Sequence, residues 1–203
     1  AKLWWRVPWM RCWLARNPLQ ASICPALRKY RYKITIENGT EIILWFGREH
    51  YHHLAGFQHL KDMPDISNPV SKQKFYNDLR SGKIPSERIK KSIHYADIHE
   101  RIASFEIIKE MLSSGARKII VEFDNRKTGS EIKAKFHLYH REGIPFKGDA
   151  VFFTLFINAE GRNVYHPVTY VVEHSNIYIR GQNIYTCSIE KLAKASKKPL
   201  VGV

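Results

Sequence analysis

Two β-rich runs joined by Asn38-Gly39 constrain the fold of this chain more than any other local feature. The runs cover residues 30–36 and 41–46, and the first alternates polar and apolar side chains. Asn-Gly accepts the positive φ angles that a tight turn between antiparallel strands requires. The sequence therefore predicts a β-hairpin here, and the regular hydrophobic pattern begins with it, near Tyr30.

Apolar residues at helical spacing follow the hairpin, which predicts a group of helices. The longest of these is expected to stop at Gly115, because glycine commonly ends helices. The first is expected to carry several histidines, and Gly56 interrupts its pattern. In chain order the predicted helices are 48–60, 71–80, a short helix that begins at Ser86, and 95–113.

The second half of the chain changes character, because β-rich runs alternate there with turn-forming residues. Helices followed by sequential strands predict an α+β fold. We expect the N-terminal β-hairpin and the helices to pack on a four- to five-stranded antiparallel β-meander. The runs predicted as strands are 118–123, 131–139, 150–157, 163–172 and 177–184.

The two ends of the chain differ in composition from its centre. Residues 1–28 hold four of the five tryptophans and five basic residues but no acidic one, which predicts a Trp/Arg-rich N-terminal arm, either native or added. Residues 29–192 form the expected main domain. Residues 193–203 form an expected basic tail.

Lysine and arginine outnumber aspartate and glutamate by 33 to 19, which gives a formal net charge of +14. Such an excess attracts phosphate-bearing partners, which include RNA and anionic membrane surfaces. No apolar run reaches the roughly 18 residues that a spanning helix needs, so we expect no transmembrane segment. The three cysteines form no CxxC pair and predict neither a disulfide scaffold nor a zinc site, which favours a reducing compartment.

Four histidines within ten positions are the clearest candidates for chemistry, since histidine exchanges protons at neutral pH. No HExxH motif, paired carboxylates or Gly-rich nucleotide loop is present, so we expect no metal and no cofactor. The residue types suit metal-free RNA cleavage instead. In that reaction a base activates the ribose 2′-OH, a cation stabilises the phosphorane-like transition state, and an acid protonates the leaving 5′-oxygen. The four are His50, His52, His53 and His59.

Several short motifs spread along the chain carry a resemblance to a known family. They are His53-Leu54-Ala55-Gly56-Phe57, Phe75-Tyr76, Ser81-Gly82-Lys83-Ile84, Arg101-Ile102 with Phe105, Tyr165-His166-Pro167-Val168-Thr169-Tyr170, and Tyr178-Ile179-Arg180-Gly181-Gln182. From about Tyr30 to Leu192 the chain resembles the phage-associated branch of the barnase, EndoU, colicin and RelE-like nucleases. The resemblance implies N-terminal helices packed on a four-stranded antiparallel sheet, and the RNase activity of toxin or mobile-element proteins.

The resemblance also implies roles for individual residues. His53 becomes the general base or acid, and Thr169 provides a hydroxyl aimed at the scissile phosphate. Phosphate oxygens would be held by Lys83, Arg101, Arg180 and Gln182, the last of these counted with the catalytic residues. His166 is either a partner acid or an incidental histidine.

Alternating cationic groups in the predicted strand 131–139 form another candidate for substrate binding. Lys133, Lys135 and His137 would lie on one face of that strand, because side chains alternate between the faces. Such a row suits a track for phosphates, and it equally suits an ordinary exposed sheet face.

These observations predict a metal-independent endoribonuclease, a bacterial toxin or phage effector. We expect RNA, transfer RNA included, as substrate, an immunity or antitoxin protein as partner, and a monomer or weak dimer. The expected location is the cytoplasm, of the producing cell or of a target cell that receives the protein. Two alternatives stay open: the scaffold can bind RNA without cleaving it, and the arm can dock the chain on a membrane surface or a partner protein.

Overall fold

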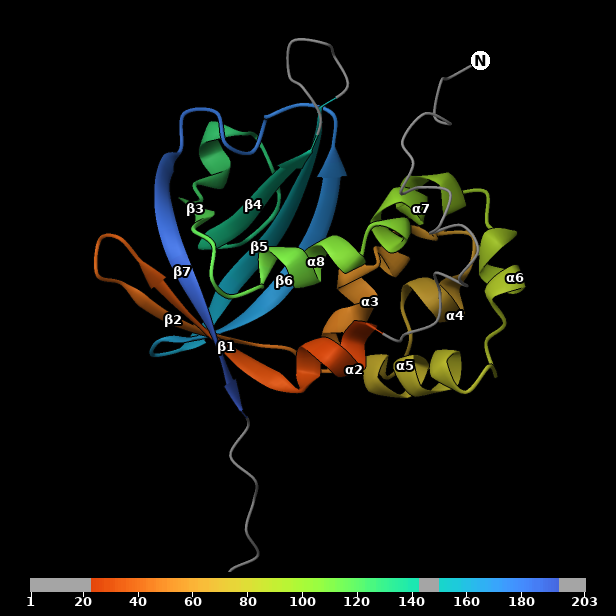
Figure 1. Cartoon of the computed structure of the whole chain (residues 1–203). Helices are drawn as coiled ribbons and strands as arrows, with labels where there is room; N and C mark the ends of the chain where they lie inside the picture. Colours follow the sequence, from red (N-terminus) through yellow and green to blue (C-terminus); the bar gives the residue numbers. More distant parts are fainter. Residues whose placement is uncertain (1–22, 143–149, 194–203) are drawn as a thin grey trace, which may run out of the picture.

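The computed structural model describes residues 23–142 and 150–193. Within these residues the chain forms a closed β-barrel with short helices beside it (Figure 1). Around the barrel the strand order is β1-β2-β6-β5-β4-β3-β7. The strands are β1 (Tyr30–Ile36), β2 (Glu41–Trp45), β3 (Lys118–Glu122), β4 (Phe136–Glu142), β5 (Val151–Gly161), β6 (Val164–Glu173) and β7 (Asn183–Ala193).

The expected four- to five-stranded antiparallel meander is wrong, although the α+β class holds. The described part of the chain forms seven strands, and β2 runs parallel to β6 through the pair Leu44 and Tyr165. The first strand pairs with the last, from Tyr30 opposite Ala193 to Ile36 opposite Cys187. Because these pairings join residues far apart in sequence, local patterns could indicate the strands but not the closure of the sheet.

Most of the helices lie between β2 and β3 in the sequence, and Figure 1 shows them gathered on one side of the barrel. Helices α3 and α7 pack against β6. The helices are α2 (Ile23–Arg28), α3 (His50–Leu54), α4 (Pro64–Ser67), α5 (Lys72–Arg80), α6 (Ser86–Lys90), α7 (Tyr95–Ala103) and α8 (Glu106–Met111), with 3₁₀ helices η2 (Phe57–His59) and η3 (Asn125–Lys127).

The hairpin and the helix over 71–80 are confirmed. Strands β1 and β2 pair antiparallel, and Gly39 in their turn has a φ of +85°. Helix α5 begins after Ser71, whose hydroxyl accepts a hydrogen bond from the Lys74 backbone N–H. Both elements were predictable because the residues that start or turn them lie within the elements themselves.

The helix expected over 95–113 is two helices, α7 and α8, which meet at Ser104. The Ser104 hydroxyl donates a hydrogen bond to the Glu100 carbonyl oxygen 2.6 Å away. The Ser104 carbonyl oxygen in turn accepts one from the Tyr170 hydroxyl of β6, at 3.1 Å. Both interactions compete with the regular helical hydrogen bonds, which explains the break and attaches the helices to the barrel.

Three expected strands have different bounds. The strand expected over 150–157 continues to Gly161. Strand β4 begins at Phe136, five residues later than predicted. The strand expected over 177–184 is mostly a turn, in which the Asn176 carbonyl oxygen accepts hydrogen bonds from the N–H groups of Ile179 and Arg180. The last strand, β7, begins only at Asn183. Residues 1–22 and 194–203, which hold most of the predicted arm and tail, lie outside the described residues.

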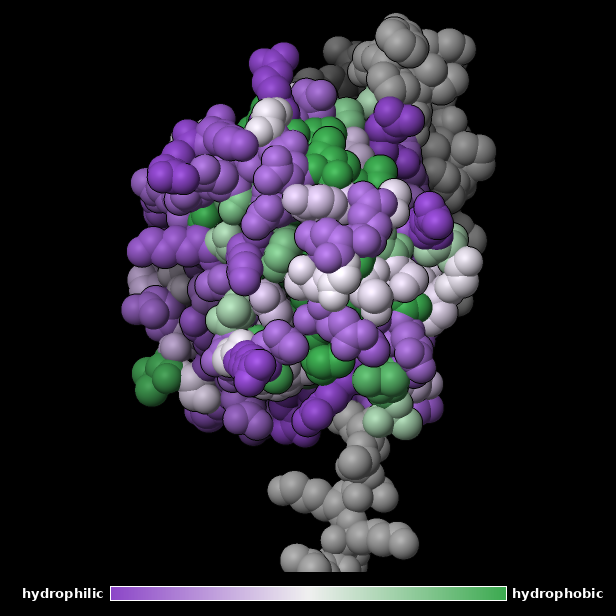
Figure 2. Space-filling model, turned by 90° about the vertical axis from the view of Figure 1, so that its left-hand side faces the viewer, coloured by the Kyte–Doolittle hydropathy of each residue, from purple (hydrophilic) through white to green (hydrophobic). Residues whose placement is uncertain are grey.

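One large apolar cluster receives side chains from every strand and continues into the helices that pack beside the barrel. A smaller cluster of Phe123, Phe156 and Val171 lies on the opposite face of β5 and β6. The barrel surface seen in Figure 2 is mainly hydrophilic, with apolar side chains in separate patches. Among the described residues no helix is long and apolar enough to cross a membrane. Members of the large cluster, one from each strand in chain order, are Ile34, Ile42, Ile120, Leu138, Leu155, Tyr170 and Ile189.

Candidate active site

The helix expected over 48–60 is interrupted at Gly56, where φ is +80°. A Cβ atom at this position would lie 3.0 Å from Ile98 Cγ2 and 3.3 Å from Arg101 Cδ. Glycine therefore satisfies both the backbone angle and the close approach of α7. The turn at Gly56 lets α3 pack against β6 while η2, which carries His59, packs against α7.

His52 supports the fold. Its side chain is buried, and Nε2 lies 2.7 Å from the Ile66 carbonyl oxygen, so Nε2 carries the proton and donates it. Burial, the largest effect, lowers the pKa of His52 to about 4. The ring also packs edge-on against Phe75. His52 thus joins α3 to α4 and α5 instead of facing a ligand.

His50 and His166 form a stacked pair between α3 and β6, with ring centroids 5.3 Å apart. The Trp45 ring packs edge-on against His50 at 5.0 Å. His50 Nδ1 accepts a hydrogen bond from the Gly47 backbone N–H at 3.0 Å. Burial lowers the pKa of His50 to about 4, which leaves this histidine neutral at pH 7. His166, predicted to bind substrate, therefore lies beside a partly buried, neutral histidine.

His53 is half-buried and contacts Lys72, the first residue of α5. Lys72 Nζ lies 2.6 Å from His53 Nε2, within hydrogen-bonding distance. Burial lowers the pKa of His53, and the charge of Lys72 lowers it further. The ring is consequently neutral at pH 7, and its Nε2 lone pair accepts the hydrogen bond of the ammonium group.

Thr169 of β6 lies next to His53. Its hydroxyl points to the His53 carbonyl oxygen at 3.5 Å, the outer limit of a hydrogen bond. Thr169 is opposite Phe156 of β5, so the two side chains share the face that carries the smaller apolar cluster. The strand therefore presents this hydroxyl beside the segment that holds the histidines.

Arg101 of α7 adds a cation to the same place. Burial lowers the pKa of its guanidinium, whereas Tyr178, Glu173 and Asp97 stabilise its charge. Its charge in turn acts on His59, whose pKa is lowered first by burial and then by Arg101. Arg101 forms no ion pair within 4 Å with any described residue. Because arginine stays protonated in proteins, the site holds a permanent positive charge.

Gln182, a predicted catalytic residue, binds the backbone of Asp124. Its Oε1 accepts a hydrogen bond from the Asp124 N–H and its Nε2 donates one to the Asp124 carbonyl oxygen, both at 2.9 Å. Arg180 is exposed in the preceding turn. Tyr178 of this turn interacts electrostatically with Arg101, so Gln182 fixes a turn that borders the candidate site.

The lysines predicted to bind phosphate are exposed. Lys83 Nζ lies 3.7 Å from a carboxylate oxygen of Asp78, just after α5. Lys133 and Lys135 precede β4. The expected row with His137 is wrong, because His137 is fully buried among aromatic rings. Strand β4 begins at Phe136, after both lysines, so the alternation of its side chains between the two faces of the sheet does not include them.

Of the residues predicted from the sequence, the structure brings His53, Thr169 and Arg101 together. Two more residues join them: His59 belonged to the recognised histidine cluster, whereas no local signal marks Lys72, which lies 19 positions after His53. We define the candidate site by these five residues. It combines a neutral imidazole, a second histidine, two cations and a hydroxyl.

Comparison with known protein families shows a similarity that covers most of the chain. A family model described as phage-Barnase-EndoU-ColicinE5/D-RelE like nuclease4 matches residues 25–199. No curated protein and no solved structure matches the chain significantly. The match spans the barrel and the helices, and so includes every residue of the candidate site.

Proposed function

We propose that this chain, which belongs to the phage-Barnase-EndoU-ColicinE5/D-RelE like nucleases, is an endoribonuclease. It would cleave RNA without a metal ion. In the proposed reaction the ribose 2′-oxygen attacks the adjacent phosphorus. The observation that carries the proposal is the contact between neutral His53 and Lys72, 2.6 Å apart. This contact supplies a proton acceptor and a cation, both of which the reaction needs.

His53 is the proposed general base. Its lowered pKa keeps Nε2 unprotonated at neutral pH, and Lys72 occupies that lone pair in the free protein. When a phosphate enters, the Lys72 ammonium can donate to a phosphate oxygen instead. The freed Nε2 then accepts the proton of the 2′-OH as the new bond to phosphorus forms.

Arg101 is proposed to stabilise the charge that builds up on the phosphate oxygens. A fixed cation in half-buried surroundings acts more strongly than one in water. Thr169 would donate a hydrogen bond to one of the same oxygens. Both residues contact the chain segment that carries His53, which favours their acting on one phosphate.

The bond from phosphorus to the 5′-oxygen must then break, and the leaving oxygen must receive a proton. His59 is the proposed donor, because it is the second histidine close enough to interact electrostatically with His53 and Arg101. Its pKa is lowered, so the fraction of molecules in which it is protonated is the one that donates. The products are a 2′,3′-cyclic phosphate on one fragment and a 5′-hydroxyl on the other. No other group is consumed, so the reaction balances without a cofactor.

The net charge of +14 favours a long polyanion such as transfer RNA as substrate. An enzyme of this kind harms the cell that contains it, so we propose a toxin that acts in the cytoplasm and is held inactive by an acidic immunity or antitoxin protein. Residues proposed to contact flanking phosphates are Lys83, Lys133, Lys135, Arg180 and His166.

The proposal is tested with total bacterial RNA and a labelled transfer RNA in excess EDTA. We expect cleavage that leaves 2′,3′-cyclic phosphate ends, because the 2′-oxygen is the nucleophile. A matched oligonucleotide with a single 2′-deoxyribose at the scissile position should resist cleavage there. Cleavage of the 2′-deoxy bond would contradict the mechanism, and salt-sensitive RNA binding without any cleavage would make the chain an RNA-binding module.

Replacing Lys72 by methionine tests how His53 is kept neutral. Loss of the ammonium should raise the pKa of His53, because Lys72 lowers it in the native protein. The base is active when unprotonated, so the acidic limb of the profile of kcat/KM against pH should move to higher pH. Loss of one phosphate-binding cation should also slow cleavage, by about 100-fold. An acidic limb that stays in place would show that Lys72 does not act on the base.

A further inference from the structure

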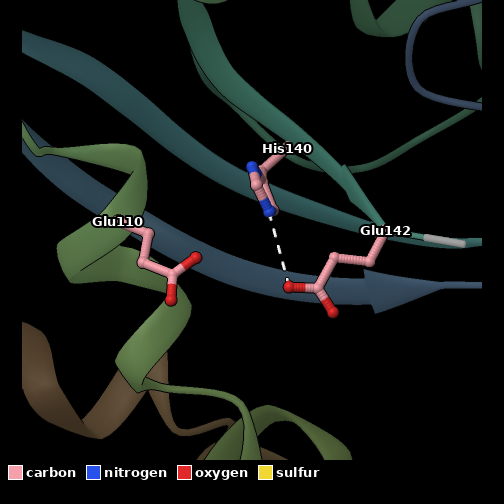
Figure 3. Close-up of side chains that lie close together, drawn as sticks. All are labelled: Glu110, His140 and Glu142. Carbon is pink, nitrogen blue, oxygen red and sulfur yellow. Dashed lines mark ion pairs between the residues drawn. The ribbon is translucent and has the colours of Figure 1, made fainter. Parts of the chain in front are cut away.

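A mixed group of ligand atoms lies at the end of the barrel interior, away from the candidate site. Figure 3 shows Glu110 of α8 reaching toward His140 and Glu142 of β4. Side chains two apart in a strand share a face, so His140 and Glu142 continue the inward row of Leu138. One imidazole and one carboxylate, both half-buried, thus follow a buried apolar residue on this face of β4, and α8 adds the exposed carboxylate of Glu110.

The spacing of these atoms suits one bound ion. One ligand atom from each residue can be chosen so that all three lie within 4.8 Å of one another. His140 Nε2 is 3.6 Å from Glu142 Oε1, which is too long for a hydrogen bond. Two ligands about 2.1 Å from a tetrahedral metal are separated by about 3.4 Å, close to the separation found here.

The 3.6 Å pair of His140 with Glu142 is the one ion pair of the group among the described residues, and it leaves Glu110 without a cationic partner there. His140 Nε2 is shielded from solvent and forms no hydrogen bond with the described residues. Within those residues, neither Glu110 nor Glu142 forms an ion pair with a lysine or arginine. The two carboxylates repel each other across the gap between α8 and β4, and a divalent cation would remove that repulsion.

We propose that Glu110, His140 and Glu142 bind one divalent transition-metal ion of the zinc class, with water completing its coordination. One nitrogen and two oxygen ligands suit zinc, manganese or cobalt better than calcium or magnesium, which prefer oxygen alone. The ion would tie α8 to the end of β4. Its role is structural, and the inference is independent of the proposed function.

The position of the group supports a role separate from cleavage. His140 pairs with Phe153 of β5, whose side chain faces the barrel interior. Thr169 pairs with Phe156, which faces the other way. The proposed metal site and the candidate active site therefore lie on opposite faces of the same sheet.

The test is titration of the metal-free full-length chain with Zn²⁺, Mn²⁺ and Co²⁺ by calorimetry, together with thermal unfolding. We expect one site per chain and a higher Tm with metal bound. Each of Glu110→Gln and Glu142→Gln should weaken binding by about 10- to 100-fold or more, because loss of a ligand costs at least as much as loss of a supporting partner. Zinc-edge anomalous diffraction should place the ion among the three side chains.

The control is Glu100→Gln, because Glu100 Oε2 lies 3.3 Å from His174 Nε2 in an exposed pair of the same kind. This variant should bind metal as the wild type does. Absence of binding in the wild type, or binding that survives both Glu110→Gln and Glu142→Gln, would overturn the proposal; the second result would locate the metal at other histidines. Thermal unfolding of each variant without metal shows whether the variant is folded. RNA cleavage in EDTA is then measured at a temperature below the Tm of the metal-free protein.

Discussion

Replacing His53 by alanine is expected to slow RNA cleavage by about 100- to 10,000-fold, the usual contribution of a general base. The affinity for RNA should change little, because the phosphates are held by the cations around His53. Single-turnover cleavage and filter binding of the same labelled RNA measure the two quantities. The 2.6 Å contact with Lys72 singles out this histidine from the others in α3.

His94→Ala is the matched control for this prediction. His94 lies before α7, is half-exposed and pairs with Asp97 at 3.4 Å, so the substitution removes a histidine outside the candidate site. This variant should cleave at the wild-type rate. If His53→Ala also retains full activity, His53 is not the base; if it loses RNA affinity and activity in parallel, its role is in binding.

Acid should destabilise the protein strongly, because three histidines that the fold shields from water, the buried His52 and His137 and the partly buried His50, resist protonation in the folded state. Burial lowers the pKa of His50, His52 and His137 from the ordinary value of 6.5 to about 4. Between these values the unfolded chain binds protons that the folded chain does not. Stability is therefore full above pH 6.5 and is lost as the pH falls toward 4.

The expected loss is large compared with the stability of a typical domain. Each histidine contributes a slope of about 1.4 kcal/mol per pH unit, or about 2 kcal/mol between about pH 6.5 and about pH 4.5. The three together lower the free energy of unfolding by about 6 kcal/mol, against a typical total of about 5–15 kcal/mol. Urea denaturation over a series of pH values measures this dependence.

A pair of variants separates titration from general destabilisation. His137→Gln keeps an N–H donor for the Tyr178 carbonyl oxygen that His137 Nε2 contacts at 3.1 Å, but it cannot be protonated. It should reduce the slope by about 1.4 kcal/mol per pH unit. Ile120→Val, which removes one methylene group from the barrel interior, should cost about 1 kcal/mol and leave the slope unchanged. Equal slopes in both variants would show that His137 is not a source of the acid sensitivity.

The sequence predicted those elements of the fold whose signals are local. Asn38-Gly39 marked the first hairpin, and the Ser71 cap marked the start of α5. The break at Ser104 was not predictable, because it depends on a hydrogen bond from Tyr170, 66 residues away. The closure of the barrel was missed for the same reason, since the partners of β1 and β2 lie at the far end of the chain.

The candidate site divides in a similar way. The resemblance to a nuclease family indicated His53, Thr169 and Arg101, which the structure brings together. Lys72 was missed because its contact with His53 arises from the packing of α5 against α3. The proposed metal ligands were also missed, because Glu110 meets the strand residues only after α8 has packed against β4.

The pairing of the first strand with the last sets the order in which this protein can be assembled. Strand β7 lies between β1 and β3, so the ladder on each side of it forms only after residues 183–193 have left the ribosome. Until then β1 has an unpaired edge, and contacts of such long sequence separation form slowly. A chain that is still being synthesised therefore lacks the closed barrel until residues 183–193 have been made and released.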